Sequence, residues 1–143
     1  MSFKIVTDSS ADIKSLEGVA FESVPLKIIT DVKEYVDDES LDVVGMIGDL
    51  QKYKGKSRSS CPNMQEYINA FGDAENVFCV TITSGLSGSF NSASMAAKAY
   101  MEEHEGRRVH VIDSLSTGAE NALLLEKIRD LILAGEEDRK SVV

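Results

Sequence analysis

The spacing of apolar residues along the chain alternates between that of strands and that of helices. Three short runs are rich in β-favouring residues: residues 3–7, 77–82 and 109–112. The last two are almost continuously apolar, as is typical of strands buried on both faces of a parallel sheet. Residues 20–30 and 34–36 also favour β structure and predict a hairpin across Asp31 and Val32.

Between these runs, apolar residues recur at helical spacing. The first such stripe predicts a helix that faces the core, with Ser40 as its N-cap. Its members, at positions i, i+3, i+4 and i+7, are Val43, Met46, Ile47 and Leu50. A shorter helix is predicted from Asp12, as its cap, through Leu16.

Three further helices are predicted over residues 64–71, 86–103 and 119–133. Pro62 and Gly72 punctuate the first of them, and Gly135 ends the last. The apolar stripe of the last helix comprises Leu124, Ile128, Leu131 and Ile132. Strands and helices in this alternation favour an α/β sandwich with a mainly parallel sheet. The 143 residues contain no internal repeat and no linker, so we expect one domain over residues 1–143.

The composition excludes several classes of protein. With 24 acidic and 15 basic residues the net charge is −9, which argues against nucleic acid as a partner. The basic cluster at residues 52–58 reads either as a solvated loop or as a positive potential beside an anion site. No apolar run approaches the roughly 20 residues that span a bilayer. Two cysteines without an export signal predict a cytoplasmic protein, and two histidines leave little for a metal site.

Hydroxyl-rich loops are the main candidates for chemistry. There are four of them, at residues 7–10, 57–60, 83–89 and 113–118. Three follow a predicted strand and three lead into a helix start, where N–H groups and hydroxyls bind anions. Ligands of open parallel sheets lie beyond the carboxyl ends of the strands, so these loops predict an anion site at one sheet edge.

Other interpretations of the same residues stay open. The turn around Ser87 resembles the nucleophile elbow of an α/β-hydrolase, which makes a small serine hydrolase or esterase the alternative function. The last glycine of that motif is Ser89 here, and neither His104 nor His110 stands where a triad partner is needed. A third hypothesis is a structural module that binds a small anion such as phosphate.

Asp8 and Cys61 invite two further hypotheses. Asp8 follows the first predicted strand, as in haloacid-dehalogenase-type phosphatases, but the second carboxylate expected two residues later is Ser10. Cys61 precedes a helix start and could be a reactive thiol. Without an acid–base pair beside it, an adventitious loop cysteine is the simpler interpretation, and Cys79 belongs to the core.

Five ordered blocks of the sequence stand out: residues 5–12, 24–26, 59–62, 82–93 and 111–114. Together they resemble the DegV family of bacterial fatty-acid-binding proteins. They cover nearly all of this chain but only about the first half of a usual family member. Two features depart from the family: Cys61 and Asn63 replace residues of a Thr-Ser-Gln-Pro-Ser motif, and the segment between Pro62 and Val77 is shorter.

The resemblance implies a three-layer α/β/α sandwich with a mainly parallel sheet. This would be the N-terminal domain of a two-domain protein, the C-terminal domain being absent from this chain. It also implies a carrier and not an enzyme, with one long-chain fatty acid held between the domains. A separate ATP-dependent fatty-acid kinase would then phosphorylate the carboxylate for phospholipid synthesis.

The same resemblance implies where the carboxylate is held. The expected ligand-binding residues are Ser59, Ser60, Ser84, Ser87 and Gly88, with Asp8, Ser9 and Ser114 as supporting residues. No metal, no cofactor, no nucleic acid and no stable membrane insertion are expected.

Overall fold

The strands form two separate sheets in a computed structural model that describes residues 2–142, and the side chains of residues 2–135. The larger sheet is four-stranded and parallel, in the order β2-β1-β6-β7. Its strands are β1 (Phe3–Asp8), β2 (Ala20–Val24), β6 (Asn76–Thr81) and β7 (Arg108–Asp113).

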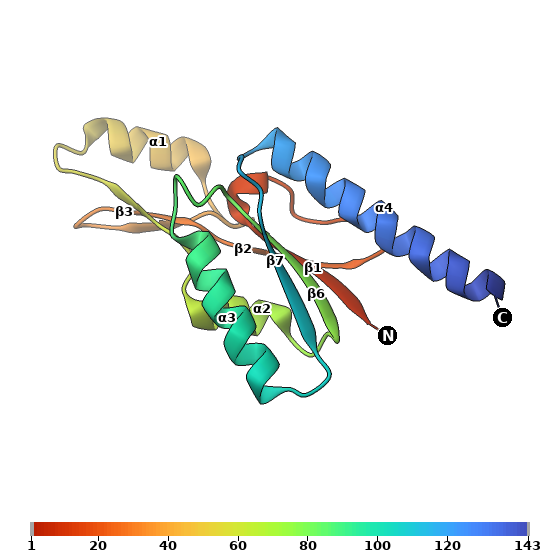
Figure 1. The fold of residues 1–143 in the computed structure, drawn as a ribbon. Helices are drawn as coiled ribbons and strands as arrows, with labels where there is room; N and C mark the ends of the chain where they lie inside the picture. Colours follow the sequence, from red (N-terminus) through yellow and green to blue (C-terminus); the bar gives the residue numbers. More distant parts are fainter. Residues whose placement is uncertain (1, 143) are drawn as a thin grey trace.

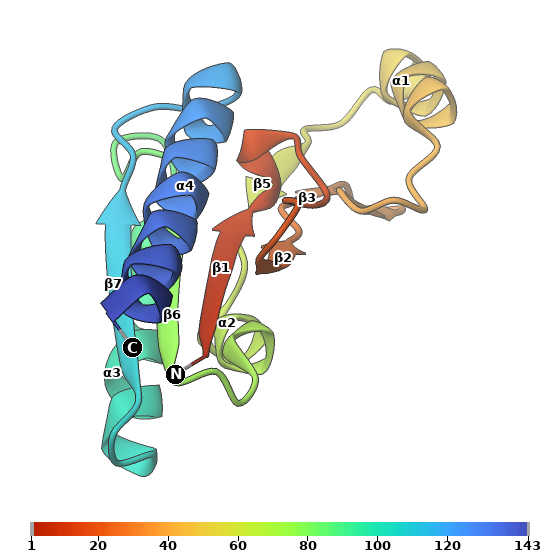
Figure 2. The ribbon, with the colours of Figure 1, turned by 90° about the vertical axis from the view of Figure 1, so that its right-hand side faces the viewer.

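Helices cover both faces of this sheet. Helices α2 (Met64–Phe71) and α3 (Ser89–Glu103) lie on one face, and α4 (Ala119–Val142) lies on the other (Figures 1 and 2). A hydrophobic cluster fills the space on each side of the sheet. The predicted three-layer α/β/α sandwich with a mainly parallel sheet is therefore confirmed.

Side-chain alternation along β6 supplies both clusters. Val77 and Cys79 belong to the cluster under α2 and α3, where the rings of Phe71 and Tyr100 meet edge to face with centroids 5.4 Å apart. Val80 belongs to the cluster under α4. Because both faces are buried, the strand is apolar almost throughout. Burial also raises the pKa of the Cys79 thiol, which keeps it protonated and unreactive.

The smaller sheet is antiparallel, in the order β4-β3-β5. Its strands are β3 (Lys27–Ile29), β4 (Glu34–Val36) and β5 (Arg58–Ser60). The predicted hairpin is confirmed, since β3 and β4 pair across Asp31 and Val32. The predicted run over residues 20–30 breaks at Pro25, which has no N–H for a ladder, so β2 and β3 enter different sheets.

Residues 58–60 form strand β5, and the prediction of a loop there is wrong. Ser59 pairs with Ile28 and Ser60 with Lys27 across the antiparallel ladder. Basic and hydroxyl residues carry no strand signal of their own, so the pairing with β3 decides the structure of this segment.

Helix α1 (Val43–Lys52) stands on the small sheet, away from the main core (Figure 2). None of its residues is buried, and Val43 and Ile47 are 51% and 48% exposed. The prediction that its stripe faces the core is wrong, because the three short strands beneath it leave a groove. This helix therefore presents apolar side chains that the described part of the chain does not cover.

Two predicted helix caps are also wrong. Helix α1 is capped by Asp42, which accepts from the Gly45 N–H at 3.0 Å, while Ser40 donates to Asp38. The short helix expected from Asp12 is replaced by a 3-10 helix, η1 (Ser9–Ala11), which Asp12 ends at a φ of 56°. The N-cap of η1 is Asp8, whose side chain accepts from the Ser10 N–H, so in both places another residue than the predicted one is the N-cap.

Two helix boundaries near the site and at the end of the chain differ from prediction. Helix α3 begins at Ser89 and not at Leu86, so the hydroxyl-rich loop before it is longer. Helix α4 continues past Gly135. Up to residue 135, where its side chains are described, the buried residues of α4 are Asn121, Leu125, Ile128 and Ile132, whereas Leu131, assigned to the stripe, is 61% exposed.

Within the described residues, no helix has both the length and the apolarity to cross a bilayer. Over the same part of the chain, no group of His, Cys, Asp and Glu side chains is arranged to hold a metal ion.

Two leucines of α4 test this orientation. Leu125→Ala should lower the free energy of unfolding by about 2–5 kcal/mol, because it leaves a cavity in place of a fully buried side chain. Leu131→Ala, the matched control, should change it by less than about 0.5 kcal/mol. Urea denaturation measures both, and equal losses would mean that the helix is rotated differently.

Candidate functional site

Three hydroxyl-rich loops meet at the carboxyl edge of the parallel sheet. Strands β6 and β7 end side by side, with Thr81 next to Asp113, and β1 adjoins β6. The Thr83 N–H donates to the Ser116 carbonyl at 3.0 Å, and the Gly118 N–H donates to the Ser10 carbonyl at 2.9 Å. The predicted convergence is confirmed for these three loops.

The fourth hydroxyl-bearing segment reaches the same place through Cys61. A Cβ added to Gly88, at the N-cap of α3, would lie 3.5 Å from the Cys61 Sγ. The end of β5, which carries Ser59 and Ser60, therefore leads directly past the loop that carries Ser84 and Ser87.

The predicted ligand residues differ in their exposure. Ser59, Ser84 and Gly88 are exposed, and Ser60, Ser87 and Ser114 are half-buried. Asp8 and Ser9 are buried. The exposed groups can meet a ligand, whereas Asp8 and Ser9 lie beneath the surface on which a ligand would rest.

Asp8 is the polar centre of this edge. Its Oδ2 accepts from the Ile82 N–H and from the Ser89 hydroxyl, both at 2.8 Å. Its Oδ1 accepts from the Ser10 N–H at 3.2 Å and also from the Ser10 hydroxyl. Asn121 of α4 in turn donates to the Ser10 Oγ at 3.2 Å. One carboxylate thus connects β1, the loop after β6 and the start of α3, and reaches α4 through Ser10.

Tyr67 extends this network into α2. Its hydroxyl contacts the Ser89 Oγ, and because the single Ser89 proton is already given to Asp8, Tyr67 is the donor. Burial, with the nearby Cys79 and Asp8, raises the pKa of Tyr67, so the phenol keeps its proton. Sequence reasoning assigned Tyr67 only to a core stripe, since nothing local relates it to a serine 22 positions later.

Ser9 joins the small sheet to this edge. Its buried Oγ accepts from the Leu26 N–H at 2.9 Å, immediately before β3. The serine predicted as a supporting residue therefore fixes the connection between the two sheets.

Asp113 fastens the Ser84 loop to the end of β7. Its Oδ1 accepts from the N–H groups of Ser84 at 3.2 Å and Leu115 at 3.0 Å. Hydrogen bonding by the Ser84 side chain, and then by the Leu115 N–H, lowers the pKa of Asp113. The sequence placed Asp113 in the right loop but did not single it out.

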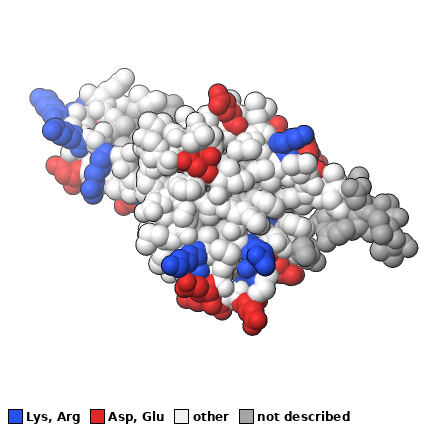
Figure 3. Space-filling model, viewed as in Figure 1, with Lys and Arg blue, Asp and Glu red and all other residues white. Residues whose placement is uncertain are grey.

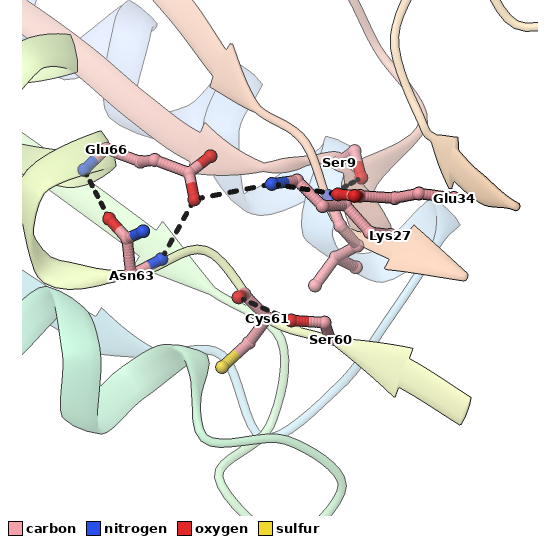
Figure 4. A network of polar contacts seen from close by, with 8 residues as sticks. Ser9, Lys27, Glu34, Ser60, Cys61, Asn63 and Glu66 are labelled. Atoms are coloured by element: carbon pink, nitrogen blue, oxygen red, sulfur yellow. Dashed lines mark hydrogen bonds and ion pairs between the residues drawn. The ribbon is translucent and has the colours of Figure 1, made fainter. Parts of the chain in front are cut away.

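Lys27 lies beside the end of β5 and is held by two carboxylates. Its Nζ is 3.3 Å from Glu34 Oε1 and 3.8 Å from Glu66 Oε1 (Figure 4). Glu66 and Asn63 form a reciprocal capping box at the start of α2. The charge of Lys27 is therefore offset before any ligand arrives.

A groove of about 370 Å³ separates α1 from the small sheet. Ser59 and Lys27 line it together with apolar side chains, among them Leu26, Ile28, Leu41, Val43 and Met46. The basic cluster at residues 52–58 begins at Lys52, the last residue of α1. This end of α1 is the one farthest from the parallel sheet, and Lys and Arg side chains gather there, at the left of Figure 3. That position lies away from the loops at the sheet edge and favours the interpretation as a solvated loop.

Ser87 lacks the surroundings of a hydrolase nucleophile. Its Oγ accepts from the Ser89 N–H at 3.2 Å. His104 is the C-cap of α3, about 22 Å away along a 15-residue helix. His110 is exposed on β7 and stacks on Phe78. Neither histidine of the described chain stands at the edge where Ser87 lies.

Comparisons with known proteins agree on one family. The family model described as "Uncharacterised protein, DegV family" matches residues 2–142. A DegV domain-containing protein of Streptococcus pneumoniae is 45% identical over 139 residues, which cover 94% of this chain and 50% of that protein. The chain thus spans about half the length of the curated relatives it matches.

Two solved structures are closely similar. A DegV family protein from Eubacterium eligens loaded with heptadecanoic acid has a TM-score of 0.92 and 45% identity, over 94% of this chain and 49% of that one. The Streptococcus pneumoniae Fatty Acid Kinase (Fak) B3 protein loaded with linoleic acid has a TM-score of 0.91 and 43% identity, over 99% and 53%.

The hydrogen bonds to Asp113 give a test of the loop geometry. Ser84→Ala should raise the pKa of Asp113 toward its ordinary value, as measured by carbon-13 NMR titration, because the Ser84 hydroxyl is the main cause of the lowering. Asp38, whose pKa is lowered by Ser40, is the internal control and should not move.

The sign of the effect on stability follows from the lowered pKa. The contribution of ionised Asp113 to the stability of the fold is present above the unfolded pKa of about 3.9, and it is lost as pH falls through the lower folded value.

In the Ser84→Ala variant, an Asp113 pKa that stays unchanged would show that Ser84 does not hold this carboxylate.

Proposed function

This chain belongs to the DegV family, and from that premise we propose that the carboxyl edge of its sheet binds the carboxylate of a long-chain fatty acid. The observation that carries the proposal is the exposed hydroxyl cluster at this edge, in a chain 45% identical to a DegV protein loaded with heptadecanoic acid. The ligand-binding residues are Ser59, Ser60, Ser84, Ser87 and Gly88.

Hydroxyl groups and a helix start suit a carboxylate that must stay reactive. Charge-assisted hydrogen bonds to an anion are worth about 1.5–3 kcal/mol each. The 15-residue helix α3 begins at Ser89, whose N–H donates to Ser87, and its N-cap Gly88 has no side chain to cap the other N–H groups. The positive end of the helix dipole therefore favours an anion at this loop. Lys27, which lines the groove beside Ser59, is already held by Glu34 and Glu66. A carboxylate held in this way remains available to a phosphorylating partner.

Apolar surface beside the hydroxyls provides for part of the acyl chain. Leu86 and Leu115, in two of the converging loops, are 70% and 78% exposed, and the groove beside Ser59 is largely apolar. Each buried methylene contributes about 0.8 kcal/mol, so an extended apolar wall is needed for tight binding. We propose that the half of the family's length outside this chain supplies the remainder of that wall.

The proposed role is that of a carrier that works with a kinase. One similar structure is a Fatty Acid Kinase (Fak) B3 protein loaded with linoleic acid. By analogy, the complete protein presents its fatty acid to a separate fatty-acid kinase in the cytoplasm, where ATP is available, and the acyl phosphate enters phospholipid synthesis. The carrier itself needs no cofactor or metal.

Serine substitutions in the complete protein test the carboxylate site. The double variant Ser59→Ala and Ser84→Ala should weaken fatty-acid binding at least about tenfold, because it removes the Ser59 hydroxyl and the Ser84 hydroxyl, which turns from Asp113 to the carboxylate when the ligand binds. The unfolding midpoint in urea should stay within experimental error, since both side chains are exposed. Fluorescent fatty-acid titration measures the affinity.

Ser57→Ala is the matched control, because Ser57 is an exposed serine just before β5 and outside the proposed site. It should bind like the unmodified protein. Unchanged affinity in the double variant would remove both serines from the site.

The division of the site between two halves gives a further expectation. The chain of residues 1–143 alone should bind fatty acid about a thousandfold more weakly than the complete protein, since five unburied methylenes cost about 4 kcal/mol. The same fluorescent fatty acid titrated into both proteins measures the ratio. Equal affinities would place the whole site within these residues and exclude a shared wall.

A further inference from the structure

We propose that Asp8 is a positioning residue that sets the affinity for the carboxylate without touching it. The inference rests on the proposed function and assigns to Asp8 the placement of the ligand-binding loops. Asp8 is fully buried, while Ser84 and Gly88 at the same edge are exposed. It therefore acts through the groups it holds.

A single oxygen of Asp8 fixes both ends of the ligand-binding loop. Oδ2 accepts from the Ile82 N–H, where the loop leaves β6, and from the Ser89 hydroxyl, where the loop enters α3. Between these two anchors lie Ser84, Ser87 and Gly88. This one atom sets the separation of the loop ends, and the direction of the central hydroxyls depends on that separation together with the bond from the Ser84 N–H to Asp113.

The same carboxylate also holds α2, through Tyr67, the fourth residue of that helix. Tyr67 donates to Ser89, which donates to Asp8, so the three groups form one directed chain of hydrogen bonds. Helix α2 follows Ser60 and Cys61 by a few residues. Asp8 thereby fixes where the hydroxyls of β5 lie relative to those of the loop after β6.

The negative charge of Asp8 is needed for this arrangement. Among the described side chains, none forms an ion pair with Asp8, so its two oxygens are stabilised by donors alone. An asparagine has one acceptor oxygen and one amide donor. In one orientation its NH₂ group would face the donors of Ile82 and Ser89, and in the other the two donors of Ser10. Because an NH₂ group does not accept, two hydrogen bonds are lost either way.

Asp38 offers a matched control within the same chain. Its Oδ1 accepts from the Ser40 N–H at 2.9 Å and the Ser40 hydroxyl at 2.5 Å, as Asp8 Oδ1 does from Ser10. Asp38 is exposed and lies outside the proposed site. The two aspartates share the local turn and differ in the Oδ2 anchors.

The experiment compares Asp8→Asn with Asp38→Asn in the complete protein, using a long-chain fatty acid and the alcohol of the same chain length. We expect Asp8→Asn to weaken the acid at least about tenfold and the alcohol less than about twofold. Asp38→Asn should change neither. A role confined to general stability would weaken acid and alcohol alike, and that result, or an unchanged acid affinity, would overturn the proposal.

Ser89→Ala keeps the inference testable if Asp8→Asn does not fold. It removes one anchor and leaves the Ile82 bond, and the same selective loss for the acid is expected. Equal weakening of both ligands, or of neither, would again refute the proposal.

Hydrogen exchange separates this inference from the proposed function. In the ligand-free protein, the Ile82 amide should exchange faster in Asp8→Asn than in Asp38→Asn. Equal exchange rates would show that Asp8 does not anchor the loop at Ile82. If the unmodified protein binds acid and alcohol equally, the proposed carboxylate site fails, whatever the exchange of Ile82 shows.

Discussion

Burying an ionised carboxylate is unfavourable unless hydrogen-bond donors replace the water it loses. Asp8 meets this condition at the end of β1 with donors drawn from η1, the start of the β6–α3 loop and the first residue of α3. These segments are as many as 81 positions apart in the sequence. The cost of leaving the charge without donors therefore fixes how they meet, and the edge that carries the proposed site depends on it.

The small sheet and α1 are organised differently from the main sandwich. The sandwich has two hydrophobic clusters, whereas α1 has no buried residue and faces an apolar groove. Apolar surface that is left exposed on a folded chain commonly marks a place where a ligand or another chain segment binds. Leu86 and Leu115, in two of the loops of the hydroxyl cluster, are exposed as well. The chain thus combines polar donors and apolar wall, as recognition of a fatty acid requires.

The sequence predicted what local patterns determine. Continuous apolar runs identified β6 and β7, and the hydroxyl-rich loops after β1, β6 and β7 do converge at one edge. Strand β5 was not predicted, because its pairing with β3, and not its own composition, makes it a strand. The contact between Tyr67 and Ser89 was not predicted either, because only the tertiary fold brings α2 next to α3. Asn63, which stands where the resemblance led us to expect a serine, caps α2, because both residue types serve as N-caps.

The central claim is that this sheet edge holds the carboxylate of a fatty acid. A crystal structure of the complete protein with a long-chain fatty acid bound tests it most directly. We expect the carboxylate oxygens within hydrogen-bonding distance of the hydroxyls of Ser59, Ser84 or Ser87, with the acyl chain passing along the apolar surface beside them. A carboxylate bound elsewhere, with these serines facing water, would contradict the account.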